Sequence, residues 1–166
     1  MILVSIISGI ILFFSFIGGI TQGAVKSFFS LISFIISLTI AGIFSPFFAA
    51  LLSFLPGKDW ENFIGFFITL ALASIVLAFV FFLPRKLTEK TWGEGVILRL
   101  VGGLLNLLGA ATGLVMFAYL ISAYPVWDWL RQAMVNSPVI DWLLSHLVFV
   151  RELLPDVMRN SINPPV

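Results

Sequence analysis

Long apolar stretches dominate the pattern of residues along this chain. Its charged side chains leave four wide gaps, at residues 1–25, 27–57, 62–84 and 100–127. An α-helix rises about 1.5 Å per residue, so about 20 apolar residues cross the hydrocarbon core of a bilayer. The shortest gap has 23 residues and the longest has 31, enough for one crossing each and too few for two. The pattern predicts four transmembrane helices, at about 2–22, 27–46, 62–83 and 100–124.

The first gap differs from a signal peptide. A signal peptide begins with a basic segment and has an apolar core of only about 7–15 residues. Here no Lys or Arg precedes Lys26, and the apolar run is longer than such a core. We therefore expect this segment to remain as the first transmembrane helix.

The second gap is longer than one crossing requires. A straight helix of this length would reach about 46 Å, well beyond the hydrocarbon core. Ser45-Pro46 offers a break, because proline lacks a backbone donor and disfavours a helical conformation in the residue before it. The segment 47–55 then either lies along the membrane interface or continues the second helix beyond a kink. We favour the kink, and Pro56-Gly57 would end the segment.

Charged residues return in the C-terminal part of the chain without ending its apolar character. The stretch 126–135 is long enough for a short helix, and Ser137-Pro138 is a strong helix-start signal. A second helix is predicted from there to about Leu154. Asp141 and His146 interrupt its apolar run, so we expect an amphiphilic segment on the membrane surface or against the bundle, and not a fifth crossing. A face that binds a partner protein is the alternative.

Basic residues indicate how the four helices are oriented. Five lie beside the links that follow the first and third helices: Lys26, Arg85, Lys86, Lys90 and Arg99. Two lie close to the membrane on the other side: Lys58 and Arg131. Because cytoplasmic loops are enriched in Lys and Arg, the links are predicted to be cytoplasmic and both termini extracytoplasmic. The chain then divides into a four-helix transmembrane domain, 1–124, and an extracytoplasmic helical tail, 125–166.

Small and polar residues recur at helical spacing inside the predicted spans. On the fourth helix they fall within an arc of about 60°: Gly102, Asn106, Gly109 and Gly113. The first and second helices carry further candidates for close packing: Gly19, Gly23, Ser30 and Ser37. Membrane helices associate through close contact at small residues, so helix packing is the first interpretation. A polar lining for a solute path is the second, with Asn106 as its best single candidate.

Composition narrows the range of possible functions. Hydrophobic residues make up 60% of the 166 residues and charged residues 10%; the net charge is +1 and the mean hydropathy +1.13. A basic face for nucleic acid is missing. With no cysteine and one histidine, neither a disulfide nor a metal site is expected. No phosphate-binding loop or catalytic constellation is evident, so the sequence predicts neither an enzyme nor a cofactor.

Three stretches resemble those of a known family. They are Gly19-Ile-Thr-Gln-Gly23-Ala-Val-Lys26, Ile97-Leu-Arg99-Leu-Val-Gly102-Gly-Leu-Leu-Asn106, and Ser137-Pro138 followed by an apolar helix and Leu154-Pro155. In their order and position they are similar to the colicin V production protein (CvpA) family of bacterial inner-membrane proteins. The resemblance implies a four-span, multi-pass protein of the bacterial inner membrane. It also implies a link to colicin V production, envelope homeostasis and stress tolerance.

Two functional hypotheses follow from the pattern and the resemblance. The first is a non-enzymatic inner-membrane protein that supports envelope processes or toxin secretion through helix assembly and protein contacts. The second is a subunit of an oligomeric channel or transporter, with a path lined by Asn106 and the serines of the second helix. The expected partners are the lipid bilayer and either further copies of the chain or other membrane proteins, with no nucleic acid.

Overall fold

The computed structural model describes residues 2–54, 59–91, 95–154 and 156–162, with the backbone alone at 85, 87–91, 156 and 157. Within these residues the chain is helical and contains no strand. The four long helices are α1 (Ile2–Gln22), α2 (Ala24–Leu51), α3 (Trp60–Thr91) and α4 (Val96–Ala123). Each contains a stretch that is long and apolar enough to cross a membrane. The prediction of an all-α membrane protein with four transmembrane helices is confirmed.

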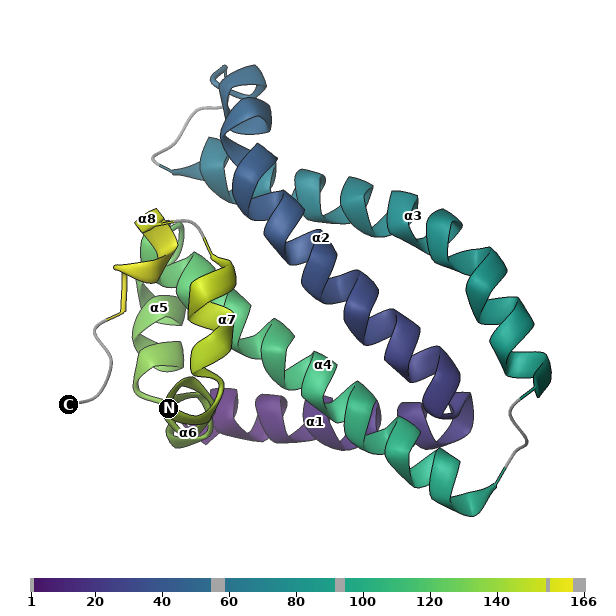
Figure 1. Cartoon of the computed structure of the whole chain (residues 1–166). Coiled ribbons are helices and arrows are strands. Elements are labelled where there is room, and N and C mark those ends of the chain that lie inside the picture. Colours follow the sequence, from purple (N-terminus) through teal and green to yellow (C-terminus); the bar gives the residue numbers. More distant parts are fainter. Residues whose placement is uncertain (1, 55–58, 92–94, 155, 163–166) are drawn as a thin grey trace.

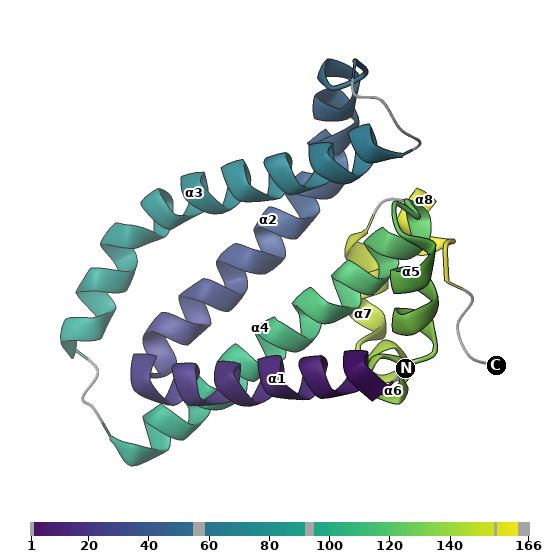
Figure 2. The same cartoon turned by 180° about the vertical axis from the view of Figure 1, so that it is seen from behind.

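The long helices associate as two pairs. Helix α3 packs along α2, and α1 packs along α4, while contacts between α2 and α4 join the two pairs (Figures 1 and 2). The α1–α2 link and the start of α4 lie at one end of the molecule, which we call the link end. The start of α1 and the C-terminal helices lie at the other, which we call the tail end (Figure 1).

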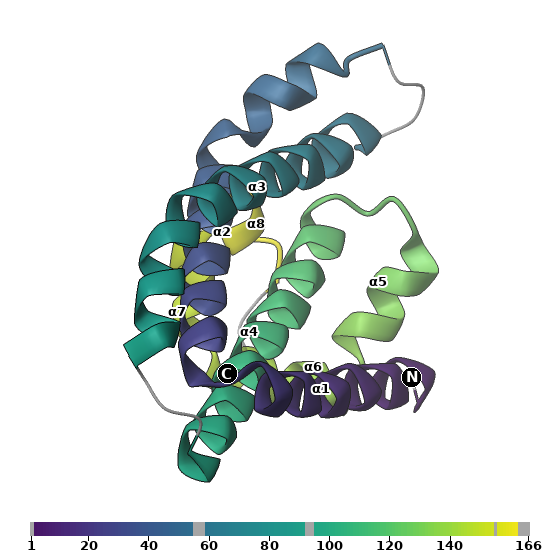
Figure 3. The ribbon, with the colours of Figure 1, turned by 90° about the vertical axis from the view of Figure 1, so that its right-hand side faces the viewer.

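Two long helices extend beyond their predicted spans. Helix α2 continues through Pro46 to Leu51, so residues 47–51 belong to the helix, as the kinked alternative predicts. Figure 3 shows the last turns of α2 running in a different direction from the rest. Helix α3 continues past Pro84 to Thr91, although its apolar stretch ends at that proline. Charged residues that lie outside the hydrocarbon core can still be helical. Helix α3 therefore ends later than the charge pattern alone indicates.

The C-terminal tail forms four short helices: α5 (Asp128–Val135), α6 (Pro138–His146), α7 (Val148–Leu153) and α8 (Asp156–Arg159). The prediction of one helix from Ser137 to about Leu154 is wrong, because the chain breaks at Leu147, whose backbone has φ −103° and ψ 46°. The break brings Val150 and Met158 into the core, where both are fully buried. Burying such side chains stabilises the fold by roughly 1.5–3 kcal/mol each, which offsets the interrupted helix.

The tail packs against the C-terminal half of α4 and does not stand apart from the bundle. Leu120 and Ile121 of α4 are fully buried in one hydrophobic core with Ile140 of α6. Ser137 precedes the first residue of α6, as predicted, but its hydroxyl does not cap that helix. Instead Ser137 Oγ lies 2.8 Å from Ser5 Oγ and ties the tail to the start of α1.

Candidate functional site

Helices α1 and α4 meet backbone to backbone near the link end. A Cβ atom built on Gly102 would lie 2.6 Å from the carbonyl oxygen of Gly19 and 2.6 Å from the carbonyl carbon of Gly23. A Cβ atom built on Gly19 would collide with the carbonyl oxygen of Gly102. Only glycine allows such an approach at both positions, so this contact fixes where the two helices cross.

Gly23 has a second constraint of its own, because it forms the link between α1 and α2. Its φ is +80° and its ψ is 166°, a region that residues with a side chain rarely occupy. A Cβ atom here would meet nothing within 4 Å. The sequence pattern grouped Gly23 with the packing glycines, whereas the structure shows that its backbone conformation also requires glycine.

Asn106 lies one turn beyond Gly102 and makes a hydrogen bond between helices. Its Nδ2 donates to the backbone oxygen of Ser15 on α1, at 2.6 Å. Because a carbonyl oxygen can only accept, this bond defines which end of the amide is nitrogen. The amide oxygen Oδ1 makes no hydrogen bond to any other residue that the structure describes.

The rest of the α4 stripe faces side chains of α2. A Cβ atom on Gly109 would lie 3.5 Å from Leu31 Cδ1, and one on Gly113 would lie 3.7 Å from Phe34 Cζ. Both are ordinary van der Waals distances. The structure therefore brings Gly102 and Asn106 against α1 and places Gly109 and Gly113 opposite the larger residues of α2.

A polar cavity of about 230 Å³, the first cavity, lies between α1, α2 and α4. Its polar lining comes from Ser15, Ser27, Ser30 and Asn106, and Gly109 also lines it. Ser27 is only 1% exposed, and its hydroxyl has no hydrogen-bond partner. A hydroxyl buried in this way costs free energy unless a ligand or water satisfies it.

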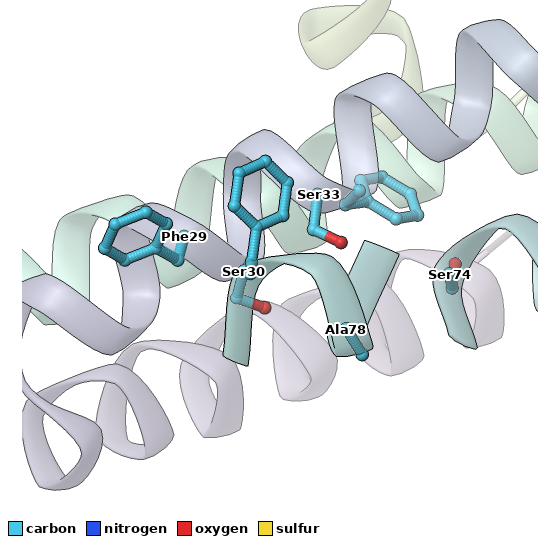
Figure 4. Close-up of a pocket in the computed structure, with 7 residues that line it drawn as sticks. Phe29, Ser30, Ser33, Ser74 and Ala78 are labelled. Carbon is cyan, nitrogen blue, oxygen red and sulfur yellow. The ribbon is translucent and has the colours of Figure 1, made fainter. Parts of the chain in front are cut away.

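A second cavity of about 270 Å³ lies on the other side of Ser30, between α2 and α3. Figure 4 shows Ser30 and Ser33 of α2 and Ser74 of α3 around it. Ser30 is exposed and, like Phe34, lines both cavities, whereas Ser37 is buried and lines neither. Sequence reasoning missed Ser15 and Ser74, because one serine in an apolar helix forms no pattern.

The basic residues predicted to be cytoplasmic fall at the link end. Lys26 lies in the first turn of α2, Arg99 in the first turn of α4, and Lys86 in the part of α3 beyond Pro84. The Nζ atom of Lys86 lies 5.9 Å from the centre of the Phe82 ring. Arg85 and Lys90 belong to α3, and their side chains lie outside the described part of the structure.

The single histidine, His146, lies within hydrogen-bond distance of a serine, but the pair does not have the geometry of a histidine base that activates a serine. His146 Nδ1 lies 3.0 Å from Ser145 Oγ and 2.8 Å from the backbone oxygen of Trp142. Because the carbonyl oxygen can only accept, Nδ1 carries the proton and cannot take one from the serine. Among the described residues, no three His, Asp or Glu side chains form a group that could hold a metal ion.

Comparison with known proteins identifies the family of the chain. Residues 4–148 match the family described as Colicin V production protein, from α1 to the start of α7. No curated protein and no solved structure matches the chain. Because the match covers most of the sequence, including the glycine crossing and both cavities, the chain belongs to the colicin V production protein family.

Proposed function

We propose that this chain is a non-enzymatic protein of the bacterial inner membrane that supports colicin-type secretion, envelope homeostasis or stress tolerance through helix assembly and protein contacts. The family supports the link to colicin V production. The observation that carries the assembly role is the position of α3. This helix packs mainly on α2 (Figure 3). Its opposite face presents large apolar side chains, among them Phe79, which is 78% exposed. Lipid can cover this face, and we propose that a second copy or another membrane protein covers part of it in place of lipid.

Cross-linking from α3 tests the assembly role. The chain has no cysteine, so Phe79→Cys provides a single reactive site on the exposed face. The matched control is Ala73→Cys on the buried face of the same helix. In native membranes we expect Phe79→Cys, and not Ala73→Cys, to form adducts with a second copy or with a membrane protein that mass spectrometry identifies. Monomer alone in both variants would contradict the proposal.

We further propose that the link end is cytoplasmic and the tail 125–166 extracytoplasmic. Lys26, Lys86 and Arg99 gather at the link end, and this charge favours the cytoplasmic side. Alkaline phosphatase fused after Val166 should be active, since it requires the extracytoplasmic side. Activity from a reporter that works only in the cytoplasm would reverse the orientation.

A channel or transporter subunit is the second candidate function. The two polar cavities favour it, because Asn106 and the α2 serines Ser27 and Ser30 line one space within the predicted membrane region. Oligomers of the chain would have to connect these cavities to both sides of the membrane. Liposomes that contain the protein should then release solute under a gradient or under tension. Liposomes with no flux would remove this candidate and leave the assembly role untouched.

A further inference from the structure

The second cavity, between α2 and α3, contains three hydroxyl groups that a molecule outside the bundle can reach. They belong to Ser30 and Ser33 of α2 and Ser74 of α3, none of which is buried (Figure 4). No hydrogen bond joins any of them to another residue that the structure describes. Hydroxyls in apolar helices commonly bond to a carbonyl oxygen of their own helix. These three do not, so they are available to donate to a molecule that enters the cavity.

The rest of the second cavity is apolar and opens on the outside of the bundle. Ser30 and Ala78 are exposed at its rim. Phe29, Phe34 and Phe81 form the other walls, and the ring centres of Phe29 and Phe81 lie 5.7 Å apart. An occupant that fits therefore has oxygen atoms that accept from the serine hydroxyls and hydrocarbon that packs on the aromatic rings.

Basic residues lie beyond this cavity toward the link end. Lys26 precedes Ser30 by one turn on the same face of α2, because residues four apart share a helix face. Lys26 is half-buried, and no ion pair or hydrogen bond holds it within the described part of the chain. On α3, Arg85 follows Phe81 by one turn. Residue 26 and residues 85–99 together carry five basic and two acidic side chains, so the charge at this end is positive.

The length of α2 indicates how deep these groups lie in a bilayer. Its 28 residues span about 42 Å, close to the thickness of a bilayer with its headgroups, about 40–45 Å. The headgroup layer takes about 5–7 Å on each side. Lys26, about 3 Å along α2, lies in that layer, and Ser30, about 9 Å along, lies where the hydrocarbon begins. A phospholipid carries its phosphate and then its ester groups at these two depths.

We infer that the second cavity binds one anionic phospholipid from the leaflet at the link end. Its phosphate pairs with Lys26, as basic residues between transmembrane helices bind anionic headgroups. Its ester oxygens accept hydrogen bonds from the three serine hydroxyls, and its acyl chains leave along the apolar surface of α3. The cavity volume of about 270 Å³ suits the glycerol ester part of a lipid and not a whole lipid.

Charge decides between lipid classes, because a zwitterionic headgroup would bring a cation of its own toward Lys26. The lipid site requires neither assembly with another protein through α3 nor passage of solute across the membrane. It therefore goes beyond both proposed functions.

Native mass spectrometry of the full-length protein in detergent tests the site, with phosphatidylglycerol and phosphatidylcholine of identical chains. We expect phosphatidylglycerol to bind several-fold more tightly. Lys26→Gln should weaken its binding about fivefold, the value of one basic residue at an anionic surface, and leave phosphatidylcholine unchanged. The matched control is Arg131→Gln, which removes an exposed basic residue at the tail end and should change neither affinity.

A second pair of variants connects binding to the cavity itself. Ala78→Phe fills the cavity from its rim and should abolish the preference for phosphatidylglycerol. Val76→Phe is the matched control, since Val76 is exposed on the same helix and lines neither cavity. If Ala78→Phe does not fold, Ser74→Ala tests the site without added volume and should weaken binding about fivefold, the value of one net hydrogen bond. Ser37→Ala, buried outside both cavities, should have no effect.

Four outcomes would overturn the inference. Equal affinity for the two lipids would mean that the protein does not recognise an anionic headgroup. Equal effects of Lys26→Gln and Arg131→Gln would mean that basic residues attract lipid without a site. Unchanged binding in both Ala78→Phe and Ser74→Ala would place the lipid elsewhere on the protein. Glycerol 3-phosphate that bound as tightly as phosphatidylglycerol would mean a site for a soluble anion.

The outcomes of these lipid titrations are independent of the cross-links from Phe79→Cys and of liposome flux. A protein that assembles through α3 or conducts solute could lack the lipid site, and one that binds the lipid could do neither. The inference and the proposed functions therefore fail separately.

Discussion

The two halves of the small-residue stripe on α4 contact their neighbours in different ways. Near the link end, a Cβ atom on Gly102 would lie 2.6 Å from the backbone of Gly19. Two turns later, a Cβ atom on Gly109 would lie 3.5 Å from the end of the Leu31 side chain. The first contact excludes every side chain at that position, and the second leaves room for one.

The residue on the partner helix explains this difference. Gly102 faces Gly19, so the two backbones approach and the helices gain close van der Waals contact, which is a main source of association in lipid. Gly109 and Gly113 face Leu31 and Phe34, whose side chains hold the backbones apart. Space remains beside Gly109, which lines the first cavity. One stripe on α4 thus forms both a tight helix crossing and part of a cavity.

The largest effect is expected at the crossing. Gly102→Ala puts a methyl group against backbone atoms of Gly19 and Gly23, which cannot move without separating α1 from α4. Overpacking of this kind should lower the free energy of unfolding by about 3 kcal/mol or more. Steric trapping in bicelles measures the loss. Gly9→Ala on α1 is the control, because nothing lies within 4 Å of its added methyl group, and it should be neutral or slightly stabilising.

The next effect is expected at the α1–α2 link, where the cause is backbone conformation and not space. Gly23→Ala forces alanine to a φ near +80°, at a cost of about 1–3 kcal/mol. Gly95→Ala is a matched control, since Gly95 also precedes a long helix and has open space around it, but its φ is −76°. Thermal midpoints in detergent should fall for Gly23→Ala alone. An equal fall in both variants would refute the conformational explanation.

Much of the fold could be predicted from the charge pattern because charge is excluded from hydrocarbon. The charge pattern could not predict the residues at which the helices begin and end. Helix α3 continues through Lys86 to Thr91, and α4 begins at Val96, before Arg99. Headgroups and water solvate these side chains while the backbone remains helical. The break at Leu147 was missed for a related reason: it is favoured by burial of Val150 and Met158 against α4, which no local pattern encodes.

Only part of the site could be predicted from the sequence. Spacing singled out Asn106 and the serines of the second helix, and the structure places Asn106, Ser27 and Ser30 around one cavity. The spacing of residues could not show that the Asn106 amide donates a hydrogen bond to Ser15 on α1, because this bond depends on how the helices cross. Nor could spacing distinguish Gly102 from Gly109, because the difference lies on the partner helices.

A smaller effect is expected from the polar contact at the edge of the crossing. Asn106→Ala keeps the Cβ atom that packs on Gly19 and removes the hydrogen bond to Ser15. Bonds of this kind between membrane helices contribute about 0.6–1.7 kcal/mol, so the free energy of unfolding should fall by that amount. Thr39→Ala, which removes a hydroxyl bonded within its own helix, is the control and should change less. A loss as large as that of Gly102→Ala would mean that the amide, and not the glycine contact, holds the crossing.

The smallest effect is expected at Gly109. This substitution tests most directly whether the Gly109 contact of α4 is looser than the Gly102 contact. Gly109→Ala adds a methyl group at an ordinary contact distance from Leu31, and alanine favours a helix interior over glycine by about 0.8–1 kcal/mol. The unfolding free energy should stay unchanged or rise by up to about 1 kcal/mol, measured as for Gly102→Ala. Gly113→Ala should behave alike, since its added methyl group would lie 3.7 Å from Phe34. If Gly109→Ala instead destabilises as strongly as Gly102→Ala, then α2 and α4 approach as closely as α1 and α4, and Gly109 does not border the first cavity.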